Sequence, residues 1–102
     1  MIVIKFGGSS VSNSKNIESV LNIIKSKNNP CIVVVSAIGG VTNLLNESGV
    51  LAEKGKKSYL NKVDLVEKKH LIIIKKLLSG SIKESAINEM KKLISELKKI
   101  LE

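Results

Sequence analysis

The sequence predicts an α/β fold that opens with a parallel βαβ unit and continues as three helices. Two short runs, IVIKF at 2–6 and CIVVVS at 31–36, are rich in β-branched residues and apolar without alternation. Strands that are covered on both faces have this pattern. One helical pattern separates the two runs, and such a connection requires parallel pairing with a right-handed crossover. Because no further strand pattern follows, we expect an incomplete domain.

The segment between the two strands has the periodicity of an amphipathic helix. Four apolar side chains recur at helical spacing and would form its buried face: Ile17, Val20, Leu21 and Ile24. The helix is expected to begin at Ser12 or Asn13, with Ser12 or Ser14 as the N-cap, and to end near Lys27. The NNP sequence at 28–30 then predicts a turn, because proline disfavours helix at the residue before it.

The remainder of the chain predicts helices only. The first spans 42–54 and stops at Gly55, although Gly49 weakens its middle. The second spans 59–78, and five residues form its apolar stripe: Tyr59, Val63, Val66, Ile73 and Leu77.

The third of these helices is expected to follow Gly80, which ends the preceding one. In SIKE at 81–84, Ser81 and Glu84 form the pattern of a capping box. Five apolar residues then repeat at helical spacing: Ile87, Met90, Ile94, Leu97 and Leu101. We interpret this stripe as core packing. Pairing with another copy stays open as an alternative, although the stripe is shorter than the three to four heptads typical of independent coiled coils.

The composition disfavours several functional classes. All 17 basic residues are lysines, and the chain has only one Phe and one Tyr, whereas nucleic-acid readout favours arginine and stacked aromatic rings. No apolar run approaches the roughly 20 residues of a membrane span, and no signal peptide is evident. Cys31 has no partner cysteine, so a reducing, cytoplasmic setting is expected. No metal site is expected, and His70 reads as a partly exposed surface residue.

Both strands are followed by loops that carry glycines and hydroxyls, FGGSS and SAIGG. In a parallel pair these loops lie at one edge of the sheet, where ligands of open α/β sheets bind. Gly7 and Gly8 would let backbone N–H groups approach an anion, and Lys5 adds a point charge. The order differs from a Walker loop and from a dinucleotide fingerprint. An ordinary tight turn, with Lys5 reaching solvent, is the alternative.

Two segments together resemble the opening of an aspartate kinase of the amino-acid kinase family. They are KFGGSSV at 5–11 and VVVSAIGGVTNLL at 33–45. In addition, KSYLNKVDLVEKKH at 57–70 resembles the bifunctional aspartokinase/homoserine dehydrogenase type. The resemblance implies that residues 1–102 form the incomplete, amino-terminal portion of a catalytic domain with a three-layer sandwich fold.

The resemblance also implies transfer of the γ-phosphoryl group of ATP, bound as its Mg²⁺ complex, to the β-carboxylate of L-aspartate. This reaction is the first step toward lysine, threonine and methionine. Lys5 would be catalytic by stabilising charge on the transferring group. The implied ligands of the ATP phosphates are Lys5, Phe6, Gly7, Gly8, Ser9 and Gly40. The implied ligands of aspartate are Ser36, Gly39 and Thr42. No tightly bound cofactor is expected, and the parent enzyme would be a homo-oligomer.

Departures from the family pattern limit what is expected of the chain alone. Ser9 stands where the family usually has threonine, but the hydroxyl is kept. The family's substrate-binding glutamate and arginine, its central acidic residue, its nucleotide-base pocket and its ACT domains have no counterpart here. Because removing oriented groups costs orders of magnitude in rate, we expect the isolated chain to be inactive or nearly so. A helical interaction module and a family member with another acid substrate remain alternatives.

Overall fold

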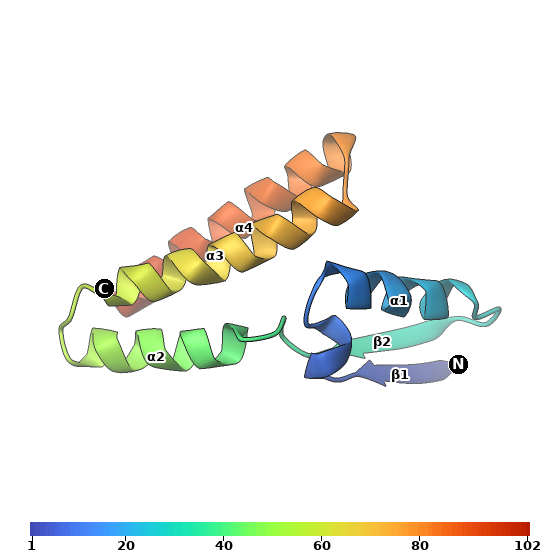
Figure 1. The fold of residues 1–102 in the computed structure, drawn as a ribbon, viewed down its shortest axis with the longest axis horizontal. Helices are drawn as coiled ribbons and strands as arrows, with labels where there is room; N and C mark the ends of the chain where they lie inside the picture. Colours follow the sequence, from blue (N-terminus) through green and yellow to red (C-terminus); the bar gives the residue numbers. More distant parts are fainter. The chain divides into compact units, whose positions relative to one another are not determined.

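The computed structural model describes residues 1–102, and the chain divides into two compact units, Met1–Gly39 and Gly40–Glu102. The first unit holds two strands, a short 3-10 turn and one helix, and the second holds three helices (Figure 1). None of the helices combines the length and the apolar character that a membrane crossing requires.

A parallel pair of strands forms the sheet of the first unit. Strand β1 (Ile2–Phe6) pairs with β2 (Cys31–Val35), in a register that places Lys5 opposite Val34. Between them lie the 3-10 turn η1 (Gly8–Val11) and helix α1 (Ser14–Lys25). The predicted parallel βαβ opening is therefore confirmed, whereas the 3-10 turn was not anticipated from the sequence.

Asn13 is the N-cap of α1, so the prediction of Ser12 or Ser14 in that role was wrong. The Asn13 side-chain oxygen accepts a hydrogen bond from the backbone N–H of Asn16 at 2.9 Å. The reason lies in the backbone: Ser12 still has helical angles (φ −72°, ψ −27°), whereas Asn13 is extended (φ −153°, ψ 176°). An N-cap needs the extended conformation immediately before the helix.

The core of the first unit lies between α1 and one face of the sheet. Phe6, Val11 and Val20 are buried, and three half-buried residues pack against them: Ile4, Ile17 and Ile24. The predicted burial of the strands on both faces was wrong for this unit, because α1 is its only helix and covers one face. Most of the strand residues are exposed. Leu21, predicted to face the core, is also exposed.

The second unit consists of α2 (Val41–Glu53), α3 (Tyr59–Leu77) and α4 (Gly80–Leu101), and each helix contacts the other two. These helices lie within about one residue of the predicted boundaries, except at the start of α4. The residues buried among them are Val41, Ser48, Val63, Val66 and Ile94. The predicted stripes of α3 and α4 supply three of these five, so both stripes serve core packing within the unit.

The predicted capping box at the start of α4 was wrong. Helix α4 begins at Gly80, with Ser79 as an N-cap that makes no side-chain hydrogen bond. Ser79 is extended, and Gly80 has a positive φ of 61° that favours glycine. Because the turn is made by these two residues, Ser81 already lies inside the first helical turn and cannot cap it.

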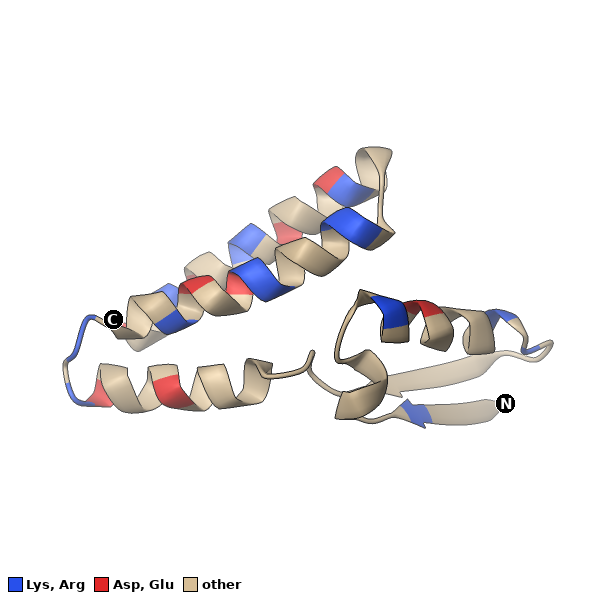
Figure 2. Cartoon of the chain, viewed as in Figure 1, with Lys and Arg blue, Asp and Glu red and all other residues tan.

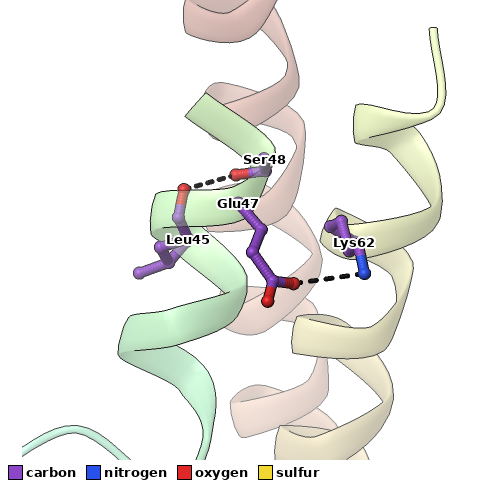
Figure 3. A network of polar contacts seen from close by, with 4 residues as sticks. All are labelled: Leu45, Glu47, Ser48 and Lys62. Carbon is purple, nitrogen blue, oxygen red and sulfur yellow. Dashed lines mark hydrogen bonds and ion pairs between the residues drawn. The ribbon is translucent and has the colours of Figure 1, made fainter. Parts of the chain in front are cut away.

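Polar contacts between the three helices are few and lie at the surface. Lys62 of α3 pairs with Glu47 of α2 at 3.1 Å, next to the buried Ser48, whose hydroxyl donates to the Leu45 carbonyl at 2.7 Å (Figure 3). Lysines and acidic residues are interspersed along the helices of this unit (Figure 2). Exposed ion pairs contribute about 0–1 kcal/mol each, so apolar packing holds the unit together.

Candidate functional site

The first glycine loop leaves β1 directly into the 3-10 turn. The Ser10 N–H donates to the Gly7 carbonyl at 3.1 Å, which closes this turn. A Cβ atom added at Gly7 would meet no atom within 4 Å, and one at Gly8 would be 3.7 Å from the Ser36 hydroxyl. Neither residue has a positive φ. The packing of the chain therefore does not require glycine at either position.

The second glycine loop begins beside the first. The Ser36 N–H donates to the Phe6 carbonyl at 3.1 Å and extends the strand pairing by one residue. Gly39 packs tightly against the 3-10 segment, because a Cβ atom there would lie 3.1 Å from Ser12 Cβ and 3.2 Å from the Ser12 carbonyl oxygen. Of the site residues predicted from the sequence, Lys5 to Ser9, Ser36 and Gly39 all belong to this one unit.

Gly40 and Thr42 belong to the second unit, at the start of α2. Gly40 is the N-cap with φ 84°, and a Cβ atom there would lie 3.3 Å from the Lys69 ammonium nitrogen. Thr42 is exposed in the first turn. This turn has no acidic residue and no side-chain cap. Lys69 therefore places a cation beside this helix start.

A polar cluster that sequence reasoning missed lies behind the first loop. The Asn16 side-chain amide donates to the Ser9 carbonyl at 2.9 Å and to the Ser12 hydroxyl at 2.8 Å. The Ser12 hydroxyl also donates to the Ser9 carbonyl, at 3.0 Å. The 3-10 turn brings these three residues together, and no periodicity in the sequence indicates that turn.

An open pocket of about 310 Å³ borders this cluster. Hydroxyl, amide and apolar side chains line it: Phe6, Ser9, Ser10, Asn16, Ser19, Val20 and Ile23. Phe6 and Ser9 are the predicted site residues that contribute to it. Phe6 is also part of the core, so its packing role is independent of any ligand.

The electrostatics of the first unit favour an anion near the loops. Lys5 is exposed and makes no ion pair. No Asp or Glu occurs in 5–16 or in 36–46. The chain has no cluster of three or more His, Cys, Asp or Glu side chains suited to a metal ion. The loops therefore offer Mg²⁺ no carboxylate, and the donor set fits an anion better than a free cation.

The amino acid kinase family model matches residues 1–99 of the chain. The aspartokinase of Rickettsia bellii is 37% identical over 92 residues, which are 86% of this chain and 23% of that protein. The chloroplastic bifunctional aspartokinase/homoserine dehydrogenase 2 of Arabidopsis thaliana is 35% identical over 98 residues, 95% of this chain and 11% of that protein. The aspartokinase of Chlamydia muridarum is 45% identical over 76 residues, 74% of this chain and 16% of that protein.

Two solved structures have the same fold. Aspartokinase III of E. coli, in complex with lysine and aspartate, superposes with a TM-score of 0.74 at 29% identity, over 94% of this chain and 20% of that one. The aspartate kinase of Clostridium acetobutylicum superposes with a TM-score of 0.78 at 24% identity, over 96% of this chain and 23% of that one. The chain spans about a fifth of the length of both. The sequence match and the shared fold agree, and the chain belongs to the amino acid kinase family.

Proposed function

We propose that residues 1–102 are the amino-terminal portion of an aspartokinase catalytic domain. The proposed reaction transfers the γ-phosphoryl group of MgATP to the β-carboxylate of L-aspartate, the first step toward lysine, threonine and methionine. The family match and the aspartokinases among the relatives support the proposal. The proposed setting is the cytoplasm, because Cys31 has no second cysteine in the sequence to pair with.

One observation carries the proposal: Gly7 and Gly8 lie where the fold does not need glycine. No positive φ and no close neighbour demands it at Gly7, and the nearest atom at Gly8 is at ordinary contact distance. Glycine in such a place costs stability, because the unfolded chain has more freedom to lose. A ligand that must approach the backbone closely would explain the two glycines, and exposed backbone N–H groups favour an anionic ligand.

In the proposed reaction, Lys5 places its ammonium near the transferring phosphoryl group, and Gly7, Gly8 and Ser9 hold the ATP phosphates. Phe6 keeps this loop on the core, while Gly40 is assigned to the phosphates as well. For aspartate we propose binding by Ser36, Gly39 and Thr42. Phosphoryl transfer depends mainly on positioning and on electrostatic stabilisation. The Mg²⁺ ion would arrive with ATP and neutralise part of its charge.

Nucleotide binding can be tested by titrating MgATP into the isotopically labelled chain and following the amide signals of Gly7, Gly8, Ser9 and Gly40 by NMR. We expect saturable shifts that are lost in Lys5→Ala. The matched control is Lys27→Ala, which removes a lysine from the segment before β2 and should behave as wild type. A folded chain without saturable shifts would contradict ATP binding by residues 1–102. Equal affinities of the two variants would contradict the role of Lys5.

Catalysis by the chain alone can be tested with ATP and L-aspartate, by following ADP release. We propose no turnover above background, because the loops supply only part of the oriented groups that such a reaction needs. Turnover at the rate of an ordinary kinase, between about 1 and 100 per second, would overturn this expectation.

A further inference from the structure

The carbonyl group of Ser9 is held by two donors from outside its own loop. The Ser12 hydroxyl reaches it at 3.0 Å and the Asn16 side-chain amide at 2.9 Å. A carbonyl only accepts hydrogen bonds, so this contact fixes the orientation of the Asn16 amide. The same amide nitrogen donates to Ser12 at 2.8 Å. The loop after β1 is therefore tied to the first turn of α1.

The same Ser12 also supports the loop after β2. A Cβ atom at Gly39 would lie 3.1 Å from Ser12 Cβ and 3.2 Å from both its Cα and its carbonyl oxygen. These distances are tighter than most real Cβ contacts, so a side chain at Gly39 would push Ser12 away by a few tenths of an ångström. The backbone of the second loop therefore packs closely against Ser12. A continuous path of contacts runs from Ser9 through Asn16 and Ser12 to Gly39.

We propose that Asn16 and Ser12 are positioning residues that set the spacing between the loop Gly7–Ser9 and the loop 36–39. This inference rests on the proposed function, in which the first loop holds ATP phosphates and the second holds aspartate. Two substrates react only when their reacting atoms are aligned, and a displacement of about 1 Å costs roughly a hundredfold in rate. Because Asn16 lies on a capped helix, the spacing is set by a rigid element.

A test without nucleotide follows from the path itself. Gly39→Ala must displace Ser12, so we expect it to shift the amide signals of Gly8 and Ser9 on the other loop. Gly49→Ala is the control, because a Cβ atom there meets nothing within 4 Å. In an Asn16→Asp background the shifts from Gly39→Ala should be clearly smaller at Ser9, because only the Ser12 hydroxyl then still bonds to the Ser9 carbonyl. Asn22→Asp, an exposed position on the same helix, should leave them unchanged.

These outcomes separate positioning from simple stabilisation. If Asn16 only stabilised α1, Asn16→Asp would lower the melting temperature but leave the shifts at Ser9 from Gly39→Ala intact, which would overturn the proposal. Shifts confined to 36–40 would overturn it as well. Should Asn16→Asp fail to fold, Ser12→Ala carries the same test, because it removes the hydroxyl but keeps the Cβ contact with Gly39.

The MgATP titration then connects the path to binding. We expect Asn16→Asp to weaken the apparent affinity roughly tenfold, because the amide bonds of Asn16 to the Ser9 carbonyl and to the Ser12 hydroxyl are lost. Asn22→Asp should change it by less than about twofold. Equal affinity of Asn16→Asp and wild type would overturn the positioning role. A wild-type chain that binds no MgATP would instead contradict the proposed function, while the experiment without nucleotide still decides whether Asn16 and Ser12 couple the two loops.

Discussion

The predicted helical stripes of the second unit and the strands of the first unit bury their apolar residues to different extents. In the second unit Val63 is fully buried and Val66 and Ile94 are nearly so, whereas in the first Val3 and Val35 are 66% and 57% exposed. Three amphipathic helices can cover one another's apolar stripes, but a two-stranded sheet with one helix leaves strand residues uncovered. Continuous apolar strands are suited to two covered faces. Periodicity therefore predicts burial well for helices and less well for strands.

The largest expected effect comes from placing a charge in the helical core. Val63→Asp should destabilise the second unit by more than about 4 kcal/mol, because a carboxylate at a fully buried position has no partner. Loss of the cooperative helical transition in a circular dichroism melt would show this destabilisation.

Val35→Asp is the matched control for that substitution in the first unit. Since Val35 is mostly exposed, the free energy of unfolding should fall by only about 1 kcal/mol. If Val35→Asp proved as damaging as Val63→Asp, the exposed strand would be part of a core, and the contrast between the units would be wrong.

A smaller effect is expected in the small core of the first unit. Val20→Ala should cost about 2 kcal/mol, because two methyl groups are removed from the contact with Phe6 and Val11. Amide hydrogen exchange in α1 and the strands measures it independently of the helical unit. Leu21→Ala removes more atoms from an exposed position and should cost less. The reverse order would mean that α1 packs through its other face.

The smallest effect is expected from removing an N-cap side chain, and it should differ between the starts of α1 and α4. Asn13→Ala should destabilise α1 by about 1 kcal/mol, because it removes the hydrogen bond to the Asn16 N–H. Ser79→Ala should change α4 by a few tenths of a kcal/mol at most, because the Ser79 side chain makes no capping bond. Urea titration of each variant compares the two. Equal losses would show that the Ser79 hydroxyl caps α4 in solution.

Much of the fold could be predicted from the sequence. Both strands, their parallel pairing and all of the longer helices follow from local patterns, and most helix ends are placed within about two residues. The caps could not be predicted, because several polar residues stand at each helix start and the choice depends on the angles of one residue. The N-cap is Asn13 at α1 and Ser79 at α4. For the candidate site, the sequence indicated both loops, but the binding roles of Lys5, Ser36 and the others stay predictions.

The sequence by itself determined the order of the elements, the two glycine loops at the strand ends and the family. These features depend on residue type and on short-range spacing, and both can be recognised directly in the sequence. Only the tertiary structure decided that Gly39 rests on Ser12, that Asn16 holds the Ser9 carbonyl and that one face of the strands is uncovered. The physical reason is that these contacts depend on the path of a 3-10 turn and on the packing of segments against one another, and neither follows from residue type and spacing.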